Sequence, residues 1–405
     1  MKMRIWLAFL MAACLILAGC QNKPGTSPLP ATPPLLDTEP TAVYNWMAGE
    51  SPVPNERIGV RRSSVSGGNQ AVSPQGTYFL AEADSAKNCY ILYADHGSDT
   101  FIKLCGRPDC SHSGGDCNAY VYSGRFLSYY NGYLYVVSGL GGGDRLIRMN
   151  PDGSNHVTVL EFQKFAKEHN AEGASFEMIS KGICMFSLYN YTEKETEVNG
   201  RLETYLAPVF LCGYMYKLDG SIPEPQKTKG GAIPFYHCGD VFFSIADSEI
   251  TDGCDSVWDW DPETDSYTYL TEYPKIPGYY GPEEAYYFRD GAVIRLDYAT
   301  HTEETLIDTG LEGEYYLFCF PECMVVASCT AGADKKLYIY NWANELVDTV
   351  EGPKSNDAMD RLLLAETAER FIFSDSWDGL PLYYLNKSEL GTGNAKLHSF
   401  TLPEL

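Results

Sequence analysis

The chain has 405 residues, 44% of them hydrophobic, which is enough apolar material for the core of one large domain. With 54 acidic and 30 basic residues its formal net charge is −24, which argues against binding to nucleic acid and to anionic membrane surfaces. Its 13 cysteines are irregularly spaced, which excludes a small disulfide-framework fold.

The chain begins with a processing signal that is not part of the fold. Lys2 and Arg4 precede an apolar run over residues 5–17, which is too short to span a membrane comfortably. Residues 17–20, LAGC, resemble the bacterial lipobox, in which the cysteine becomes the lipidated first residue. We expect residues 1–19 to be a lipoprotein signal peptide and Cys20 to carry palmitate-type chains. The alternative is an ordinary secretory signal cut at a nearby site.

A proline-rich stretch follows the lipobox. Eight prolines with scattered Thr, Ser and Gly lie between Gln21 and Pro54, a composition that cannot build a core. We therefore expect residues 20–60 to be a flexible stalk and residues 61–405 to be the globular domain. In this arrangement the protein would be anchored on the outer face of the bacterial cytoplasmic membrane.

The globular part is built on a repeat. Each copy is an apolar run that ends in Asp or Asn before a polar turn, and successive copies end 36 to 69 residues apart, at Asp95, Asn150, Asp219, Asp261, Asp297, Asn341 and Asn386. A period of about 40 to 50 residues with four strands per unit is typical of β-propeller blades, which stack around an axis because one blade cannot bury both faces. The repeat predicts an all-β propeller of seven four-stranded blades. Six or eight blades, and a pair of β-sandwiches, are the alternatives.

Within these units the elements can be assigned in chain order. Residues 126–137 form a hairpin that turns at Asn131-Gly132, and residues 145–162 form two strands joined by a turn at Pro151-Asp152-Gly153. Residues 161–169 are the best helix candidate, and the charged insertion 191–201 is expected to extend a hairpin. We assign residues 286–294, which turn at Asp290-Gly291, to the first two strands of the fifth unit. The residues before Cys89 begin a unit or complete the last one.

One segment carries a metal-ligand pattern. Cys105, Cys110, His112 and Cys117 fall within 13 residues as C-x4-C-x-H-x4-C, and the glycines and proline between them let the chain wrap around a point. Three thiolates and one imidazole suit tetrahedral zinc, and ferrous iron could use the same set. Four protein ligands leave no open position, so the site would be structural. The alternative is a disulfide, such as Cys105 with Cys117, which export to an oxidising compartment favours.

These segments also carry a resemblance to a known group. The LAGC tetrapeptide, the CGRPDCSHSGGDC loop and the closing GLPLYYLNKSELGTGNAKLHSF look like cell-surface lipoproteins of gut-type anaerobic Firmicutes that carry TolB-like propeller repeats. The resemblance covers residues 1–405. It implies a surface-anchored propeller and brings no activity with it.

No catalytic motif is recognisable: the nucleophile elbow, the HExxH helix, the phosphate loop and the dinucleotide fingerprint are all missing from the sequence. We therefore assign no catalytic residue and expect a monomeric, non-enzymatic binding protein whose ligand is a glycan, a peptide or a partner protein. The first alternative is an extracellular carbohydrate-active hydrolase or lyase, which needs carboxyl groups with shifted pKa values. The second is a structural scaffold of an envelope complex, which needs an exposed apolar patch.

Overall fold

The computed structural model is an almost entirely β protein. It describes residues 43–53, 68–139, 143–180, 182–198, 201–228, 236–238, 241–246, 256–261, 263–272, 277–281, 283–313, 315–328, 335–352, 363–374, 380 and 382–405. The signal peptide, Cys20, residues 21–42 and 54–60 of the stalk, and residues 61–67 at the start of the predicted domain lie outside these ranges. In the described part, no helix has the length and apolar character needed to cross a membrane.

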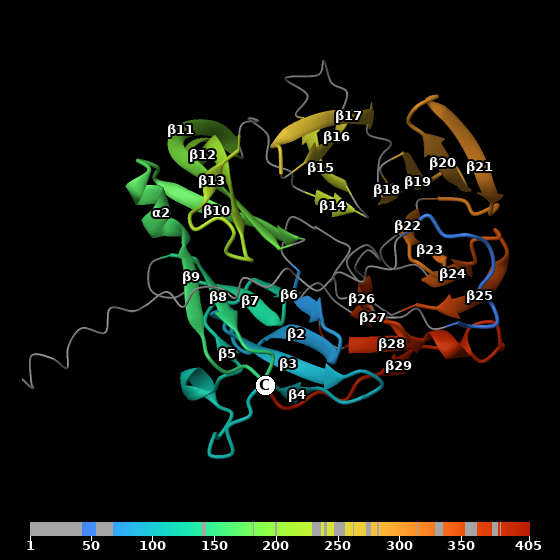
Figure 1. The fold of residues 1–405 in the computed structure, drawn as a ribbon, viewed down its shortest axis with the longest axis horizontal. Coiled ribbons are helices and arrows are strands. Elements are labelled where there is room, and N and C mark those ends of the chain that lie inside the picture. The colour runs from blue at the N-terminus through green and yellow to red at the C-terminus, as the bar shows by residue number, and fades with distance from the viewer. Residues whose placement is uncertain are drawn as a thin grey trace, which may run out of the picture.

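The described strands form seven antiparallel sheets, which we number in chain order (Figure 1). Each sheet is built from consecutive strands, and six of the seven have four strands, while β5 adds a fifth strand to sheet 1. The bounds are as follows: sheet 1, β1 Gln70–Val72, β2 Gly76–Glu82, β3 Cys89–Asp95, β4 Ile102–Lys103 and β5 Tyr120–Val121; sheet 2, β6 Phe126–Tyr130, β7 Tyr133–Ser138, β8 Arg145–Met149 and β9 Val157–Glu161; sheet 3, β10 Gly173–Ser180, β11 Ile183–Val198, β12 Arg201–Lys217 and β13 Gln226–Lys227; sheet 4, β14 Tyr236–Cys238, β15 Val241–Ala246, β16 Ser256–Asp261 and β17 Ser266–Glu272; sheet 5, β18 Pro277–Tyr280, β19 Glu284–Arg289, β20 Ala292–Asp297 and β21 Thr302–Asp308; sheet 6, β22 Tyr315–Cys319, β23 Met324–Ser328, β24 Lys336–Tyr340 and β25 Leu346–Glu351; sheet 7, β26 Leu363–Glu366, β27 Arg370–Ser374, β28 Leu382–Asn386 and β29 His398–Ser399.

Neighbouring sheets share hydrophobic cores. Residues of sheets 2 and 3 pack together, Trp260 of sheet 4 packs on the methionines of sheet 3, and Leu270 of sheet 4 packs on sheet 5. Sheets 5 and 6, and sheets 6 and 7, share two further cores. The core of sheet 1 includes residues of both sheet 2 and sheet 7. In Figure 1 most of the first strands gather near the middle of this arrangement and the fourth strands lie toward its rim.

The last sheet also contacts the first through hydrogen bonds. The Arg370 guanidinium donates to the Gly97 carbonyl oxygen at 2.8 Å and to the Ser98 carbonyl oxygen at 2.5 Å. Thr100 and Thr401 form an isolated parallel bridge beside this contact. Sheets 1 and 7 are therefore joined although they come from opposite ends of the described chain.

The seven repeat copies correspond to one position in the sheets. Each apolar run that ends in Asp or Asn is the third strand of its sheet, from β3 in sheet 1 to β28 in sheet 7. The side chain of the terminal Asp often caps the following turn: Asp297 Oδ1 accepts from the Thr300 backbone N–H at 2.8 Å, and Asp219 Oδ1 from that of Ser221 at 2.8 Å. The repeat therefore reflects a turn requirement after each third strand.

Most of the element assignments are confirmed and one is wrong. The 126–137 hairpin is β6 and β7, with Asn131 and Gly132 at positive φ as a tight turn requires, and residues 145–162 contain β8 and β9. The helix is α2, Phe162–Glu168. Residues 286–294, however, belong to the second and third strands of sheet 5, because its first strand is the short β18. The residues before Cys89 begin sheet 1 with β1 and β2.

The N-terminal segment, residues 43–53, packs on the sheets although it lies within the stretch that we assigned to the stalk. Tyr44 Oη donates to the Ala368 carbonyl oxygen at 2.8 Å and Trp46 Nε1 to the Lys387 carbonyl oxygen at 2.9 Å. Further along, Val53 is buried in the core between sheets 5 and 6. This segment therefore contacts sheets 5, 6 and 7.

Candidate metal centre and buried carboxyl group

Both ends of the Cys/His loop are held by one strand. The backbone carbonyl of Ile91 in β3 accepts from the Leu104 N–H at 2.9 Å, and the Ile91 N–H donates to the Ala119 carbonyl oxygen at 2.8 Å. Leu104 and Ala119 are buried, so the chain leaves sheet 1 and returns to it at neighbouring points. Everything between them is a closed loop whose shape depends on its own contacts.

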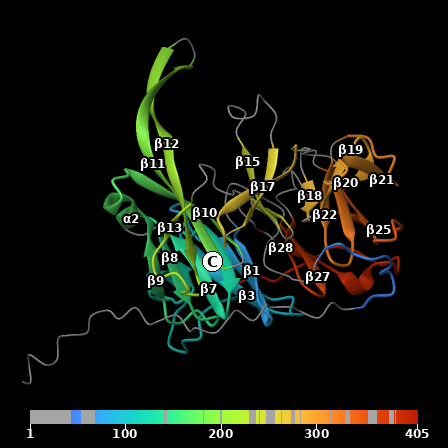
Figure 2. The same cartoon turned by 45° about the horizontal axis from the view of Figure 1, so that its top comes forward.

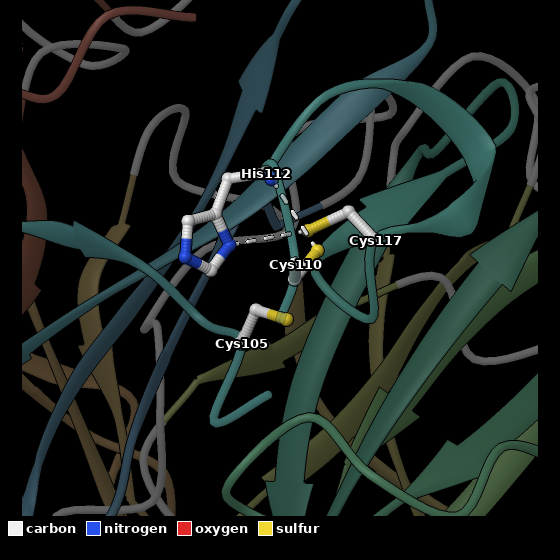
Figure 3. A group of neighbouring side chains, drawn as sticks. All are labelled: Cys105, Cys110, His112 and Cys117. Atoms are coloured by element: carbon white, nitrogen blue, oxygen red, sulfur yellow. Dashed lines mark hydrogen bonds between the residues drawn. The ribbon is translucent and has the colours of Figure 1, made fainter. Parts of the chain in front are cut away.

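Tight turns inside this loop bring the four candidate ligands together. The Cys110 N–H donates to the Arg107 carbonyl oxygen at 3.3 Å, and the Cys117 N–H to that of Gly114 at 3.1 Å. His112 has a φ of 54°, and its carbonyl oxygen accepts from Lys103 Nζ at 3.0 Å. These contacts turn the His112 ring toward the cysteines (Figure 3).

The four side chains converge as a tetrahedral site requires. The ligand atoms of Cys105, Cys110, His112 and Cys117 all lie within 4.8 Å of one another, and His112 Nδ1 lies 3.8 Å from Cys117 Sγ (Figure 3). With metal–sulfur bonds of about 2.3 Å, the edge of a tetrahedral site is about 3.8 Å. Modest inward movement would therefore complete the site, and this cluster could hold a metal ion.

Backbone amides point at all three sulfurs. Cys105 accepts from the N–H of Arg107, Cys110 from that of His112 at 3.3 Å, and Cys117 from that of Ala119. In each case the donor lies two residues after the cysteine. Hydrogen bonds of this kind stabilise a thiolate relative to a thiol, and the thiolate is the form that binds metal.

The cysteines differ in how readily they ionise. Burial alone would raise the pKa of Cys105, but backbone N–H groups and the Cys110 and Cys117 thiols hydrogen-bond to its sulfur and lower the pKa to about 7. Burial raises the pKa of Cys117 to about 11. Cys105 therefore becomes a thiolate at lower pH than Cys117, and a cation in the cluster would be needed to ionise Cys117 near neutral pH.

A second group stands out on the first strand of sheet 3. Glu177 is the extra residue of a β-bulge in β10, between the paired residues Phe176 and Met178. Ser187 Oγ of β11 donates to Glu177 Oε1 at 2.5 Å. Burial raises the pKa of this carboxyl, while hydrogen bonds from Ser187 and Ser175 lower it in part. Glu177 lies beside Met178, which packs with Trp260 of sheet 4.

Glu177 differs from the other acidic groups of the described residues. Where a pKa shift of an Asp or Glu is resolved there, it is downward for Asp84, Asp152, Asp261, Asp297, Glu303 and Glu389 and upward only for Glu177. A half-buried carboxyl group whose pKa is raised by burial, at a bulge on the first strand of a sheet, is a candidate proton donor. The sequence analysis missed it because a bulge leaves no pattern in the residues.

No protein-family model and no curated protein matches this chain. Solved structures do resemble it. A puromycin-hydrolyzing peptidase of Mycobacterium tuberculosis aligns with a TM-score of 0.46 and 11% identity, covering 91% of this chain and 57% of the peptidase. The β-propeller domain of the trilobed protease from Pyrococcus furiosus, reported to have an open velcro topology, gives 0.36 and 12%, covering 67% of this chain and 93% of that domain. TolB from Acinetobacter baumannii gives 0.29 and 9%, covering 80% and 65%.

These likenesses concern the fold, and the activities belong to the named proteins. This chain spans little more than half the length of the mycobacterial peptidase. The comparison nevertheless corrects our main functional expectation. Several of the similar structures are named peptidase or hydrolase, which contradicts our expectation of a non-enzymatic binding protein, although at 10–14% identity the likeness itself shows the fold alone. The resemblance to TolB-like propellers agrees with the comparison at the level of the fold.

Proposed function

We propose that this chain is a hydrolase built on a closed β-propeller of seven blades, with Glu177 as its proton donor. The observation that carries the proposal is the Glu177 carboxyl: burial raises its pKa, and it sits at a bulge on a first strand. A general acid must be protonated at working pH and within reach of the leaving group. The shared cores and the contact between sheets 7 and 1 support the closed ring.

Activity measurements test this proposal. Purified protein lacking residues 1–20 is assayed against labelled polysaccharides and labelled peptides. Glu177→Gln keeps the hydrogen-bonding shape but cannot donate a proton as an acid, so we expect kcat to fall about 100-fold or more. Glu351→Gln, at an exposed rim carboxyl, is the matched control and should keep full activity. A wild-type protein without turnover, or a Glu177→Gln variant that retains it, would refute the proposal.

We propose in addition that Cys105, Cys110, His112 and Cys117 hold one structural zinc ion. The backbone N–H groups directed at the three sulfurs support thiolate ligands. With these four residues as ligands the coordination shell is full, so zinc would cross-link the loop and would not activate water. We expect protein purified under reducing conditions to contain one zinc per chain by elemental analysis. Cys110→Ser should lose it, whereas Cys89→Ser, at a buried thiol outside the cluster, should not.

The anchoring of the protein is the third part of the proposal. Lipidation at Cys20 would hold it on the outer face of the cytoplasmic membrane, and several acyl chains together bind a membrane stably. A Cys20→Ser variant should appear in the medium instead of the membrane fraction and should not incorporate labelled palmitate. A wild-type protein without label would contradict the lipobox assignment.

A further inference from the structure

Sheet 3 carries a long two-stranded projection, which we call the β-arm: residues 189–198 of β11 and 201–212 of β12. The neighbouring strands end early, since β10 pairs with β11 only as far as Tyr189 and β13 pairs with β12 only at Tyr214 and Met215. Beyond these points β11 and β12 pair only with each other, down to Val198 and Arg201. Figure 2 shows the β-arm projecting away from the sheets.

The β-arm exposes an unusual amount of apolar surface. Twelve large hydrophobic side chains are exposed among the described residues, and six of them lie on the β-arm: Tyr191, Tyr205, Leu206, Val209, Phe210 and Leu211. The exposed fraction of Leu206 reaches 63%. Apolar side chains gathered on one projection, and not scattered singly over the surface, are typical of an interaction site.

The strand register places an apolar and acidic set on one face. Tyr189 is opposite Phe210, Tyr191 opposite Pro208, and Glu193 opposite Leu206. Directly opposite residues share a face, and so do alternate residues along a strand. Leu206, Phe210 and Tyr191 therefore lie on the same side as Glu193 and Glu195, while Lys194 lies on the other side. This side combines apolar bulk with negative charge.

The β-arm lies at the opposite end of the sheets from the N-terminal segment. It is the hairpin between the second and third strands of sheet 3, whereas Tyr44 and Trp46 contact residues between the first and second and between the third and fourth strands of sheet 7. In an antiparallel four-stranded sheet these turns lie at opposite ends. In Figure 2 the β-arm and residues 43–53 accordingly lie on opposite sides of the sheets.

We propose that this face of the β-arm docks an extended segment of another protein that carries apolar and basic residues together on one side, at alternate positions along the segment. Alternate side chains of an extended strand are about 6.6 Å apart, which matches the spacing of the apolar positions along the β-arm. Basic residues of the partner would meet Glu193 and Glu195. A second copy of this chain is a less suitable partner, because its own carboxylates and its net charge of −24 would be repelled by those of the first copy. The proposal is independent of the hydrolase activity.

Peptide binding tests the proposal directly. The probe is a fluorescent peptide that repeats Leu-Ser-Lys-Ser, compared with one that repeats Leu-Ser-Glu-Ser, so that Leu and the charged residue share one side, and binding is followed by fluorescence anisotropy. We expect the Leu/Lys peptide to bind and the Leu/Glu peptide not to. Leu206→Ser and Phe210→Ser should each weaken binding about tenfold, since each removes an apolar contact. A double Glu193→Gln, Glu195→Gln variant should weaken binding and reduce its dependence on salt.

A matched control separates the β-arm from the acidic surface in general. Leu346 is 54% exposed on the outer strand of sheet 6, and Leu346→Ser should leave the affinity unchanged. The proposal is overturned if neither peptide binds, if both bind equally, or if Leu346→Ser weakens binding as much as Leu206→Ser. Light scattering adds the remaining outcome: a dimer of the wild type that Leu206→Ser dissociates would make a second copy the occupant and would also overturn it.

Discussion

Cys105 of the metal cluster favours the thiolate more than Cys117 does. Backbone amides and two neighbouring thiols offset the effect of burial and lower its pKa to about 7. At pH 7 about half of such a group is ionised, against about 1% of a thiol with a pKa of 9. Because nucleophilicity falls with pKa, we expect Cys105 in metal-free protein to react with iodoacetamide about tenfold faster than an ordinary exposed thiol.

The pH dependence and the metal supply the controls for this prediction. The rate at Cys105 should reach about half of its maximum near pH 7 and level off above about pH 8, because the thiolate is then almost fully formed. Cys184 and Cys323, whose pKa values are raised by complete burial, should remain unmodified, as peptide mapping by mass spectrometry will reveal. Added zinc should protect Cys105. Preferential reaction at Cys117, or no protection by zinc, would contradict the assignment of the cluster.

At the scale of single residues, the sequence predicted which residues form the candidate metal site but not the hydrogen bonds and burial around them. The four ligand residues could be found because they lie close together in the chain, so any compact loop brings them near one another. The amides that point at their sulfurs depend on the local turns, which the sequence does not specify. Glu177 could not be found at all: the chain has 54 acidic residues, and only the bulge and the two serines distinguish this one.

Among the elements, the third strands were the most predictable. In four of them the Asp or Asn at the end accepts a backbone N–H of the following turn, as Asp297 does for Thr300. The first strands were harder, since some are very short: β14 has three residues and β18 has four. This is why residues 286–294 were placed one strand too early in sheet 5.

The amino-acid composition did not predict that the N-terminal segment, residues 43–53, packs on the sheets. Its prolines indicated a stalk, yet Trp46 packs against the core shared by sheets 6 and 7 and stacks on Tyr44, with ring centroids 5.5 Å apart. We expect Trp46→Ala to lower the free energy of unfolding by about 2 kcal/mol, less than for a fully buried tryptophan because this side chain is half-buried. Denaturant titration followed by intrinsic fluorescence measures the loss.

The neighbouring Val43 is the control for this prediction. It is 91% exposed, so Val43→Ala should leave the stability unchanged. The Trp46→Ala variant should also be cut by protease within residues 43–53 faster than the wild type, because a released segment becomes accessible. Equal stability of the two variants would mean that the segment contributes nothing to the fold.

For the molecule as a whole, the repeat predicted that the chain is built of similar four-stranded sheets, but it did not predict how the first and last sheets contact each other. Among the described strands every sheet is built from consecutive strands, so none of these strands from one end of the chain completes a sheet from the other. The contact between the first and last sheets depends instead on side chains and on a few backbone hydrogen bonds. Because Arg370 and its partners lie more than 270 residues apart in sequence, no local pattern could predict their contact.

Arg370 should therefore control the junction between sheets 7 and 1. Its guanidinium also donates to Asn386 Oδ1 at 3.0 Å and lies 4.2 Å from the centroid of the Tyr384 ring. Hydrogen bonds from a charged group contribute about 1.5–3 kcal/mol, so Arg370→Ala should lower the free energy of unfolding by about 2 kcal/mol. Hydrogen exchange should accelerate in β1 and around Thr401 while sheet 3 stays protected, because only the junction is loosened.

The comparison variant for the junction is Arg289→Ala. Arg289 pairs with Glu303 within sheet 5 and is partly exposed, so its loss should cost less than about 1 kcal/mol and should not affect β1. If Arg370→Ala behaved like Arg289→Ala, the ends of the sheet array would not be held by this contact. If instead the whole molecule exchanged faster at once, the seven sheets would unfold as one unit, and the junction would limit the stability of the entire sheet array.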